Sequence, residues 1–594
     1  MSIETIKIDR PTTDKEFPGE SGPNFGLQTI TDIIEYRYRT EPEKEAFTYL
    51  LDGEKEAIRW RYKDLKNGIA LVGHKLSQQD VKKKRVLLLF EPGLAFITAY
   101  LATISSGAIA VPCHPPMGKS QVKRLWDMIE SCEPTAILHS SLIRSTNAQF
   151  NRITELAIER DIHLIDVDIP AVPIEIEWKH PEIDKHDIAM LQYTSASTGD
   201  PKGVVVSQEN LVKNCEEIYH WLGPDAARRG CIWLPPYHDM GLLGGIMQPL
   251  YAGFPLYFMS PMHFIQRPLR WLKALSDHKL SLTGAPNFAF QLCADAVELD
   301  EIKNSNIDLS CVKDIFCGSE PINPDTMNAF HHKYAKFGLN KSTINPCYGL
   351  AEITLFASGR PKGTVFKTHT FDQEKLDAGL AEKSQNGLSI VSCGLPASQH
   401  DIKIVNPETK TPCPNKAIGE IWLAGPSVTH GYWGNEKLTD FSFNNTLPGN
   451  THQYYRTGDL GFIYDEELFV NGRRKELIII RGRNLYPQDI ERCALRSTPH
   501  LEQAGAAAFS VRHTDTESLV VVIELKLRAK NDYVDEITRC VTAAVRNEFN
   551  ITPHEVYVGP RGTVPRTTSG KIQRTATKKA YENNELRAFK RAKS

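Results

Sequence analysis

Short apolar runs alternate with helical patterns over the first 180 residues of the chain. Val86–Phe90 and Ala108–Pro112 are continuous apolar runs, which is typical of strands buried on both faces. Between them a helix is expected from Pro92, because proline is favoured in the first helical turn. This βαβ pattern predicts a parallel sheet. The same region adds one helix and two short strands, at Leu65–Leu76, 136–138 and 163–165.

The first βαβ segment is also the part of the chain that could suggest a membrane span. The four residues Lys82–Arg85 are basic, and no Lys or Arg follows until Lys119. However, Glu91–Pro92 and Ser105–Gly107 interrupt the apolar run before it reaches the roughly 20 residues that a spanning helix needs. We therefore expect a buried globular core and no membrane span.

A polar loop lies between two apolar runs at residues 188–206, a pattern that predicts strand, turn and strand. Small and hydroxyl-bearing residues let backbone N–H groups converge, so the loop suits a polyphosphate, although a solvated hairpin tip would have a similar composition. It is not a Walker loop, because the G-x-x-x-x-G-K-[ST] spacing is missing and a strand follows. The candidate phosphate-binding residues are Thr194, Ser195, Ser197, Thr198, Gly199 and Lys202.

Three later strands also end in glycine and polar residues. Short apolar runs lead to Gly284, to Gly318–Pro321 and to Tyr348–Glu352. The carboxyl ends of strands carry the ligand site in a parallel α/β sheet, so these distant segments are expected to converge. Ser207 is expected to cap a helix that runs to Leu222.

The pattern changes in the second half of the chain. Residues 359–385 are polar and turn-rich, without an obvious core strand, and resemble an insertion. A β-rich part follows at about 390–471. After a turn at 472–475, a small α/β region is expected at 476–594, with a hairpin that pairs Gly505–Val511 with 519–526. The predicted fold is thus α/β, with a large N-terminal domain at 1–471, a hinge, and a small mobile C-terminal domain.

Composition excludes several classes of protein. A chain of 594 residues with 41% hydrophobic and 24% charged residues is a soluble protein of several domains. The net charge of −2 gives no sign of nucleic-acid binding. Twelve scattered cysteines suggest neither a zinc site nor disulfides, and the N-terminus is too polar for a secretory signal, so a cytoplasmic location is expected. The basic end of the chain, Arg561–Ser594, is either a solvated helical end or a patch for an anionic partner.

Four motifs in order resemble the adenylate-forming superfamily of acyl-CoA synthetases, peptide-synthetase adenylation domains and luciferases. They are the hydroxyl-rich stretch 193–204, Tyr348-Gly349-Leu350-Ala351-Glu352, Tyr455-Arg456-Thr457-Gly458-Asp459 and Gly570-Lys571. Finer features, including Pro235-Pro236-Tyr237-His238-Asp239-Met240-Gly241 and the insertion, are similar to the fatty acyl-AMP ligases. One departure is Ala196, where the family usually has glycine.

The resemblance implies that a carboxylate joins the α-phosphorus of ATP and expels pyrophosphate. Glu352 would then hold Mg²⁺, and Asp459 and Arg473 would hold the ribose. Without the resemblance, Glu352 could be a helix N-terminal acid and Asp459 a turn residue. Adenine would lie against the following residues, of which Tyr348 could equally be a core tyrosine: Gly318, Ser319, Glu320, Pro321, Tyr348 and Gly349.

The same resemblance assigns the reacting groups. Lys571 would bridge the acyl carboxylate and the nucleotide, whereas a lone lysine in a basic tail would be a solvated charge. His238 would close on the carboxylate or α-phosphate, or else be a packed structural histidine. Lys475 lies where the family places its hinge. The run Gly244, Gly245, Ile246 and Met247 could line an acyl tunnel, although a core helix would have the same composition.

The sequence favours a carrier protein over coenzyme A as the acyl acceptor. Acyl-CoA synthetases usually have a glycine-rich loop where this chain has Arg481-Gly482-Arg483, and the insertion could brace the C-terminal domain against rotation. We therefore expect a fatty acid to be activated and passed to an acyl carrier protein in trans. A fatty acyl-CoA synthetase is the alternative, and a non-catalytic nucleotide-binding protein is a remote one.

Overall fold

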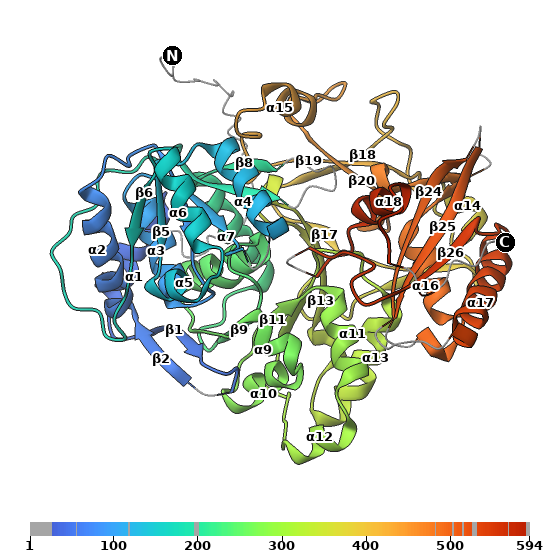
Figure 1. Ribbon diagram of the computed structural model, residues 1–594, viewed down its shortest axis with the longest axis horizontal. Coiled ribbons are helices and arrows are strands. Elements are labelled where there is room, and N and C mark those ends of the chain that lie inside the picture. Colours follow the sequence, from blue (N-terminus) through green and yellow to red (C-terminus); the bar gives the residue numbers. More distant parts are fainter. Residues whose placement is uncertain are drawn as a thin grey trace.

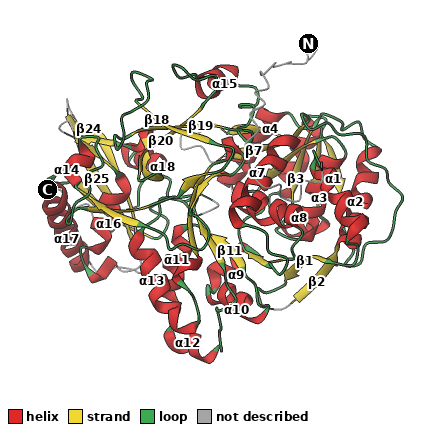
Figure 2. Ribbon diagram, turned by 180° about the vertical axis from the view of Figure 1, so that it is seen from behind, coloured by secondary structure: helices red, strands yellow, loops and turns green. Residues whose placement is uncertain are grey.

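The computed structural model describes residues 26–54, 56–116, 119–194, 201–480, 483–501, 504–513, 516–525, 531–567, 570–587 and 589. The N-terminal sheets and their helices make up one side of the molecule, and the C-terminal strands and helices lie at the other side (Figure 1). Helices cover the sheets of both parts when the molecule is seen from behind (Figure 2).

The first sheet has six strands in the order β6-β5-β3-β4-β7-β8. All neighbours are parallel except β7 and β8. The predicted βαβ unit is confirmed as β3, α3 and β4, although the helix begins at Leu94, after Gly93, and not at Pro92. Helix α3 is buried on nearly all sides, which explains its continuous apolar sequence. The strands are β3 (Arg85–Leu89), β4 (Ile109–Cys113), β5 (Ala136–His139), β6 (His163–Asp166), β7 (Ile188–Thr194) and β8 (Lys202–Ser207), and the helix is α3 (Leu94–Ser105).

The second sheet has nine strands in the order β17-β14-β13-β12-β11-β9-β10-β1-β2. The six strands from β13 to β1 are parallel, so their carboxyl ends lie at one edge, as the sequence predicted. Its strands are β1 (Glu45–Leu50), β2 (Glu56–Arg61), β9 (Gly230–Ile232), β10 (Leu256–Phe258), β11 (Leu282–Ala285), β12 (Asp314–Cys317), β13 (Ile344–Gly349), β14 (Phe356–Gly359) and β17 (Leu395–Pro396).

Helix α7 (Gln208–Leu222) is one of the helices of this N-terminal part. Ser207 is its N-cap and accepts a hydrogen bond from the backbone N–H of Asn210 at 3.1 Å, which confirms the predicted cap. Other helices include α1 (Ile30–Thr40), α2 (Tyr62–Ser77), α8 (Gln248–Ala252), α11 (Asn287–Ala296) and α13 (Pro324–Tyr334). Among the described residues, no helix is both long and apolar enough to cross a membrane.

The β-rich part is an antiparallel sheet of four strands, β18 (Asp401–Val405), β19 (Gly419–Ala424), β20 (Tyr455–Tyr464) and β21 (Glu467–Arg473). The segment expected to be a turn-rich insertion contains a strand, β15 (Thr368–Phe371), and a helix, α14 (Gln373–Asp377); β15 pairs with β16 (Leu388–Val391). Phe371 is fully buried against Phe462 and Phe469 of the β-rich sheet. The expectation that this insertion lacks a core strand was therefore wrong.

The last part of the chain has a hydrophobic core of its own. Strands β24 (Gly505–His513) and β25 (Thr516–Leu525) form the predicted hairpin, and β26 (Glu555–Pro560) adds in parallel. Helices α16 (Pro487–Arg496) and α17 (Asn531–Phe549) belong to this core, and the helix α18 (Arg574–Glu582) contacts β24. A short pair, β22 (Ile478–Ile480) and β23 (Arg483–Leu485), precedes them.

Candidate active site

The ends of β7 and β8 frame the candidate phosphate loop. Thr194 and Lys202 are cross-strand partners at these ends. The predicted residues Ser195, Ser197, Thr198 and Gly199 lie outside the described residues. The Lys202 ammonium lies 5.5 Å from the centre of the Tyr432 ring.

Lys202 lies in a group of cations. Burial lowers the pKa of Lys202, and the positive charges of Lys475 and Arg473 lower it further, while Glu352 opposes the shift. Cations that repel one another in this way are stabilised by a bound anion. The predicted hinge residue Lys475 lies in the short helix η5 (Arg474–Glu476). Its positive charge acts on Lys202 at the predicted phosphate site.

Glu352 lies in the 3-10 helix η4 (Ala351–Ile353), directly after strand β13. The hydroxyl of Tyr432 donates a 2.8 Å hydrogen bond to its carboxylate Oε1. Among the described residues, no group of three or more His, Cys, Asp or Glu side chains could hold a metal ion. A single carboxylate still suits Mg²⁺, which is commonly bound through one or two carboxylates together with substrate phosphates and water.

The candidate ribose site joins strands from two sheets. Asp459 and Arg473 are cross-strand partners on β20 and β21, and the Arg473 Nε lies 3.2 Å from the Asp459 Oδ1. The Tyr348 hydroxyl, at the end of β13, donates a buried 2.7 Å hydrogen bond to Asp459 Oδ2. The Asp459 carboxylate raises the pKa of Arg473, and burial together with Asp459 raises that of Tyr348. The structure thus brings Tyr348 to the Asp459–Arg473 pair, although Tyr348 and Asp459 are 111 positions apart in the sequence.

The candidate adenine segment follows strand β12. Ser319 has a φ of 74°, an uncommon value for a residue other than glycine. The Glu320 carboxylate accepts a 2.6 Å hydrogen bond from the backbone N–H of Phe288, and burial raises the Glu320 pKa. Gly349 lies so close to the Leu355 carbonyl that a Cβ atom would collide with it. A Cβ atom on Gly318 would lie 3.1 Å from the Cys347 carbonyl oxygen. The segment after β12 therefore packs closely against the main chain of β13.

Lys571 reaches this site from the C-terminal part. Its loop is closed by hydrogen bonds from Thr567 N to Lys571 O at 2.8 Å and from Lys571 N to Thr567 Oγ1 at 3.0 Å. Gly570 has a φ of 87°, and a Cβ atom there would meet the Phe288 ring. Burial lowers the pKa of Lys571, while the negative charges of Asp239, Glu320 and Asp459 oppose the shift. The contact of Gly570 with Phe288 therefore brings the Lys571 loop to the N-terminal part, where these acids act on the charge of the lysine.

His238 is paired with its neighbour Asp239. The His238 Nδ1 lies 2.6 Å from the Asp239 Oδ1. Burial favours the neutral form of Asp239, but His238, Lys571 and the Met240 N–H together lower its pKa to about 2. Asp239 stood in the motif that contains His238 but was assigned no role, although its position directly after His238 was an available signal.

The glycine-rich run forms a π-helix, η1 (Met240–Met247). Such helices are rare in proteins, and those that occur are often found at functional sites. A small apolar pocket of about 10 Å³ lies beside it. Ile246 lines this pocket, whereas Gly245 packs on Ile232, Gly244 on Leu355, and Met247 is fully buried. The pocket is lined by Pro92, Gly93, Ile97, Ile232, Leu234, Pro236, Gly241, Ile246, Leu256, Phe258 and Met259.

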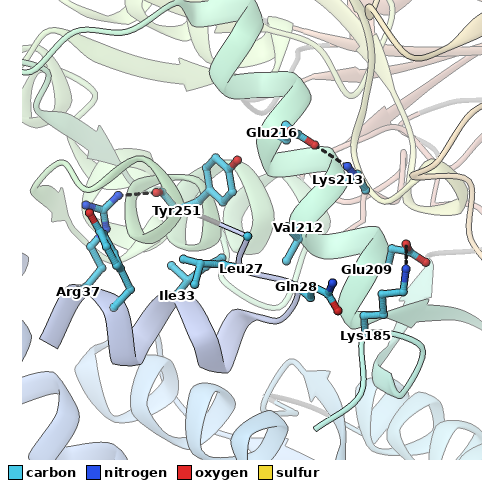
Figure 3. Close-up of a pocket in the computed structure, with 12 residues that line it drawn as sticks. Leu27, Gln28, Ile33, Arg37, Lys185, Glu209, Val212, Lys213, Glu216 and Tyr251 are labelled. Carbon is cyan, nitrogen blue, oxygen red and sulfur yellow. Dashed lines mark hydrogen bonds and ion pairs between the residues drawn. The ribbon is translucent and has the colours of Figure 1, made fainter. Parts of the chain in front are cut away.

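A second, more open pocket lies elsewhere, between α1, α7 and α8 (Figure 3). Its charged side chains are already paired: Lys185 with Glu209 at 3.2 Å, and Lys213 with Glu216 at 2.9 Å. None of the predicted site residues lines it. This pocket therefore has no part in the chemistry argued below.

Comparisons with known proteins identify the family of this chain. Residues 34–433 match the family of AMP-binding enzymes, and residues 475–591 match the AMP domain of Disco-interacting protein 2-like proteins. The medium-chain-fatty-acid–[acyl-carrier-protein] ligase JamA of Moorena producens is 35% identical over 94% of this chain and 95% of its own. A protein of Mycobacterium leprae named putative fatty-acid–CoA ligase fadD21 is 32% identical over 94% of this chain and 98% of its own.

A solved structure is similar to this chain over nearly its whole length. The fatty acyl-adenylate ligase of L. pneumophila, in complex with acyl adenylate and pyrophosphate, is 32% identical, with a TM-score of 0.72. The match covers 96% of this chain and 98% of that chain. The fold and these similarities define an AMP-binding enzyme. The chain belongs to the AMP-binding enzymes of the adenylate-forming superfamily, in the branch of the fatty acyl-AMP ligases.

Proposed function

We propose that this enzyme uses ATP to convert a fatty acid into an acyl-adenylate, releases pyrophosphate, and passes the acyl group to the phosphopantetheine thiol of an acyl carrier protein. The observation that carries the proposal is the approach of the Lys571 loop to the N-terminal part: a Cβ atom on Gly570 would lie 2.8 Å from the Phe288 ring, beside Glu320, and the charges of Asp239, Glu320 and Asp459 act on the Lys571 pKa. A cation held there can neutralise charge where the two anionic reactants meet.

The first step joins one carboxylate oxygen of the fatty acid to the α-phosphorus of ATP and expels pyrophosphate. Asp459 and Arg473 hold the ribose, and the cations around Lys202 hold the β- and γ-phosphates. Asp239 fixes the Nδ1 side of His238, so the other ring nitrogen can contact the carboxylate. Lys571 stabilises the charge that moves between the reacting oxygens. Glu352 would hold Mg²⁺, which neutralises phosphate charge.

The hydrocarbon chain of the fatty acid would extend along the apolar side chains beside η1, and these side chains would have to move apart, because the pocket there has room for only about one water molecule. Ile246 and Phe258 belong to its lining, and both are buried. Burial of a chain in such a pocket contributes about 0.8 kcal/mol per CH₂ group.

In the second step the carrier thiol would attack the acyl carbonyl, and AMP would leave. The C-terminal domain, 476–594, would rotate about 472–475 to admit the thiol. One contact favours a carrier over coenzyme A as the acceptor. Asp377 of the insertion accepts hydrogen bonds from Arg483 of β23 at 3.2 and 2.5 Å, so the insertion is attached to the domain that must rotate. We place the enzyme in the cytoplasm.

The experiment that tests the proposal is ATP–pyrophosphate exchange with fatty acids of increasing chain length. We expect exchange that depends on both the fatty acid and Mg²⁺, and acyl transfer to a phosphopantetheinylated carrier protein. Exchange that is absent at every chain length would overturn the proposal and favour a nucleotide-binding protein without activity. Formation of acyl-CoA as fast as acyl-AMP would favour the acyl-CoA synthetase.

A further inference from the structure

Thr354, two residues after Glu352, has a backbone conformation that β-branched residues rarely adopt. Its φ and ψ are 71° and −62°, and the Leu355 N–H donates to the Ile353 carbonyl at 2.9 Å. This is the positive-φ form of the γ-turn, which is rare and strained. Thr354 is also only 1% exposed. Strained residues persist where the surrounding structure enforces them, and they cluster at functional sites.

The loop at residues 426–429 enforces this turn. The Thr354 hydroxyl donates to the Ser427 carbonyl at 2.7 Å, and the Ser427 hydroxyl donates to the Ile353 carbonyl at 3.1 Å. The N–H and the hydroxyl of Thr429 both donate to the Glu352 carbonyl, at 2.9 and 3.0 Å. The loop therefore fixes the main chain at Glu352 and at the two residues that follow it.

Helix α7 holds the loop in turn. The Asn210 side-chain amide donates to the carbonyls of Pro426 and Val428, at 3.1 and 3.2 Å. The Asn214 amide donates to the Ser427 hydroxyl at 3.0 Å and to the Ile353 carbonyl at 3.3 Å. The two asparagines are four residues apart and so lie on one face of the helix. Both are buried, which makes an unpaired group here costly.

We propose that Thr354, together with Ser427 and Asn214, is a positioning residue that holds Glu352 for a divalent cation bound to the polyphosphate of ATP. The inference rests on the proposed function, in which Glu352 is a metal ligand. The buried network fixes the main chain of Glu352, and the Tyr432 hydroxyl orients its carboxylate. Mg²⁺ needs a near-ideal coordination geometry, so an error in the position of its ligand weakens binding.

The test measures binding of Mn²⁺, a paramagnetic substitute for Mg²⁺, to the enzyme with ATP and without fatty acid. Because ATP alone also binds Mn²⁺, electron paramagnetic resonance of free Mn²⁺ is recorded with ATP alone and with enzyme and ATP, and the difference gives the dissociation constant of the enzyme-bound site without turnover. Thr354→Val keeps the shape but removes the hydroxyl, and we expect a roughly tenfold weaker constant, because outer partners of metal ligands contribute about 10–100-fold. Thr354→Ser retains the hydroxyl and should restore the wild-type constant.

A matched control is Thr103→Val. This threonine is also fully buried and donates to the Ala99 carbonyl at 2.7 Å, but it lies within α3, and its replacement should leave Mn²⁺ binding unchanged. The same Mn²⁺ constant for Thr354→Val as for the wild type would overturn the inference. If Thr354→Val does not fold, as judged by thermal unfolding, Ser427→Ala decides the question in the same assay.

Glu352→Gln separates the inference from the function on which it rests. Weak Mn²⁺ binding by Glu352→Gln together with normal binding by Thr354→Val would refute only the positioning role. Normal binding by Glu352→Gln would refute the metal role of Glu352, and the positioning role with it. Weak binding by Glu352→Gln and Thr354→Val, with rescue by Thr354→Ser, supports both.

Discussion

Asp377→Ala should release the C-terminal domain from the insertion. The Asp377 side chain is 4% exposed and that of Arg483 is 33% exposed, so their ion pair is partly shielded from water. Two guanidinium nitrogens of Arg483 donate to one carboxylate oxygen, and a third donates to the Phe549 carbonyl at 2.5 Å. The substitution leaves that last bond in place and removes the link to α14, together with the 2.9 Å hydrogen bond that Gln373 of α14 donates to Asp377 Oδ1.

The size of the effect follows from the burial of the pair. Charge-assisted hydrogen bonds contribute about 1.5–3 kcal/mol, whereas fully exposed ion pairs contribute about 0–1 kcal/mol. A half-shielded pair should therefore contribute about 2 kcal/mol. Because 1.4 kcal/mol is a factor of ten in an equilibrium, the substitution should shift the balance between rotated and unrotated domain by roughly 30-fold.

The assay compares two products of the same enzyme. Acyl-AMP formation is followed by pyrophosphate release, and acyl-CoA formation by chromatography after addition of coenzyme A. We expect Asp377→Ala to raise the ratio of acyl-CoA to acyl-AMP by up to the same factor, with acyl-AMP formation little changed. Glu374→Ala, at an exposed position of the same helix, is the control. An unchanged product ratio, together with an unchanged domain orientation in small-angle scattering, would refute the reasoning.

The remaining predictions concern the site itself. Lys571→Ala should slow fatty acid-dependent exchange by about 10²–10³ while calorimetry shows unchanged ATP binding; persistent exchange would refute its role. Burial lowers the pKa of Lys571, so its charge and the exchange rate should be lost as pH rises through that value, and Lys571→Arg should move the loss to higher pH. Tyr348→Phe removes the 2.7 Å hydrogen bond to Asp459. Leaving a buried acceptor without its donor costs about 1–3 kcal/mol, so the KM for ATP should rise roughly tenfold, and an unchanged KM would contradict this. Ile246→Phe should shorten the longest fatty acid accepted in a chain-length series, and an unchanged limit would exclude this pocket.

The sequence predicted those features that local patterns specify. Continuous apolar runs gave β3 and β4, and Ser207 marked the start of α7, because a buried strand and a helix cap each depend on a few neighbouring residues. The position of Asp459 was suggested by the family resemblance and not by the strand pattern. Strand ends rich in glycine predicted that Gly318 and Tyr348 would lie at one edge of a sheet. That prediction needed only the rule that parallel strands end at one edge of a sheet.

The sequence could not predict contacts between distant polar residues. Asp377 and Arg483 are separated by more than one hundred positions. The residues around each of them in the sequence give no sign that the two side chains form an ion pair. The insertion was misjudged for a related reason. Phe371 is the fully buried residue of a short strand whose apolar partners, Phe462 and Phe469, come much later in the chain. Periodicity over four residues is too short to identify such a strand.

The ion pair between Asp377 and Arg483, called the latch below, also affects whether a carrier protein or coenzyme A accepts the acyl group. A ligand shifts a conformational equilibrium only by the difference between its affinities for the two states. A carrier protein has a surface that can bind the rotated domain and so supply about 2 kcal/mol, whereas coenzyme A offers only its pantetheine and nucleotide. A latch of this strength would therefore delay transfer to coenzyme A and still allow transfer to a carrier. A stronger latch would not improve the selectivity for a carrier over coenzyme A, because it would prevent the C-terminal domain from rotating even when the carrier binds.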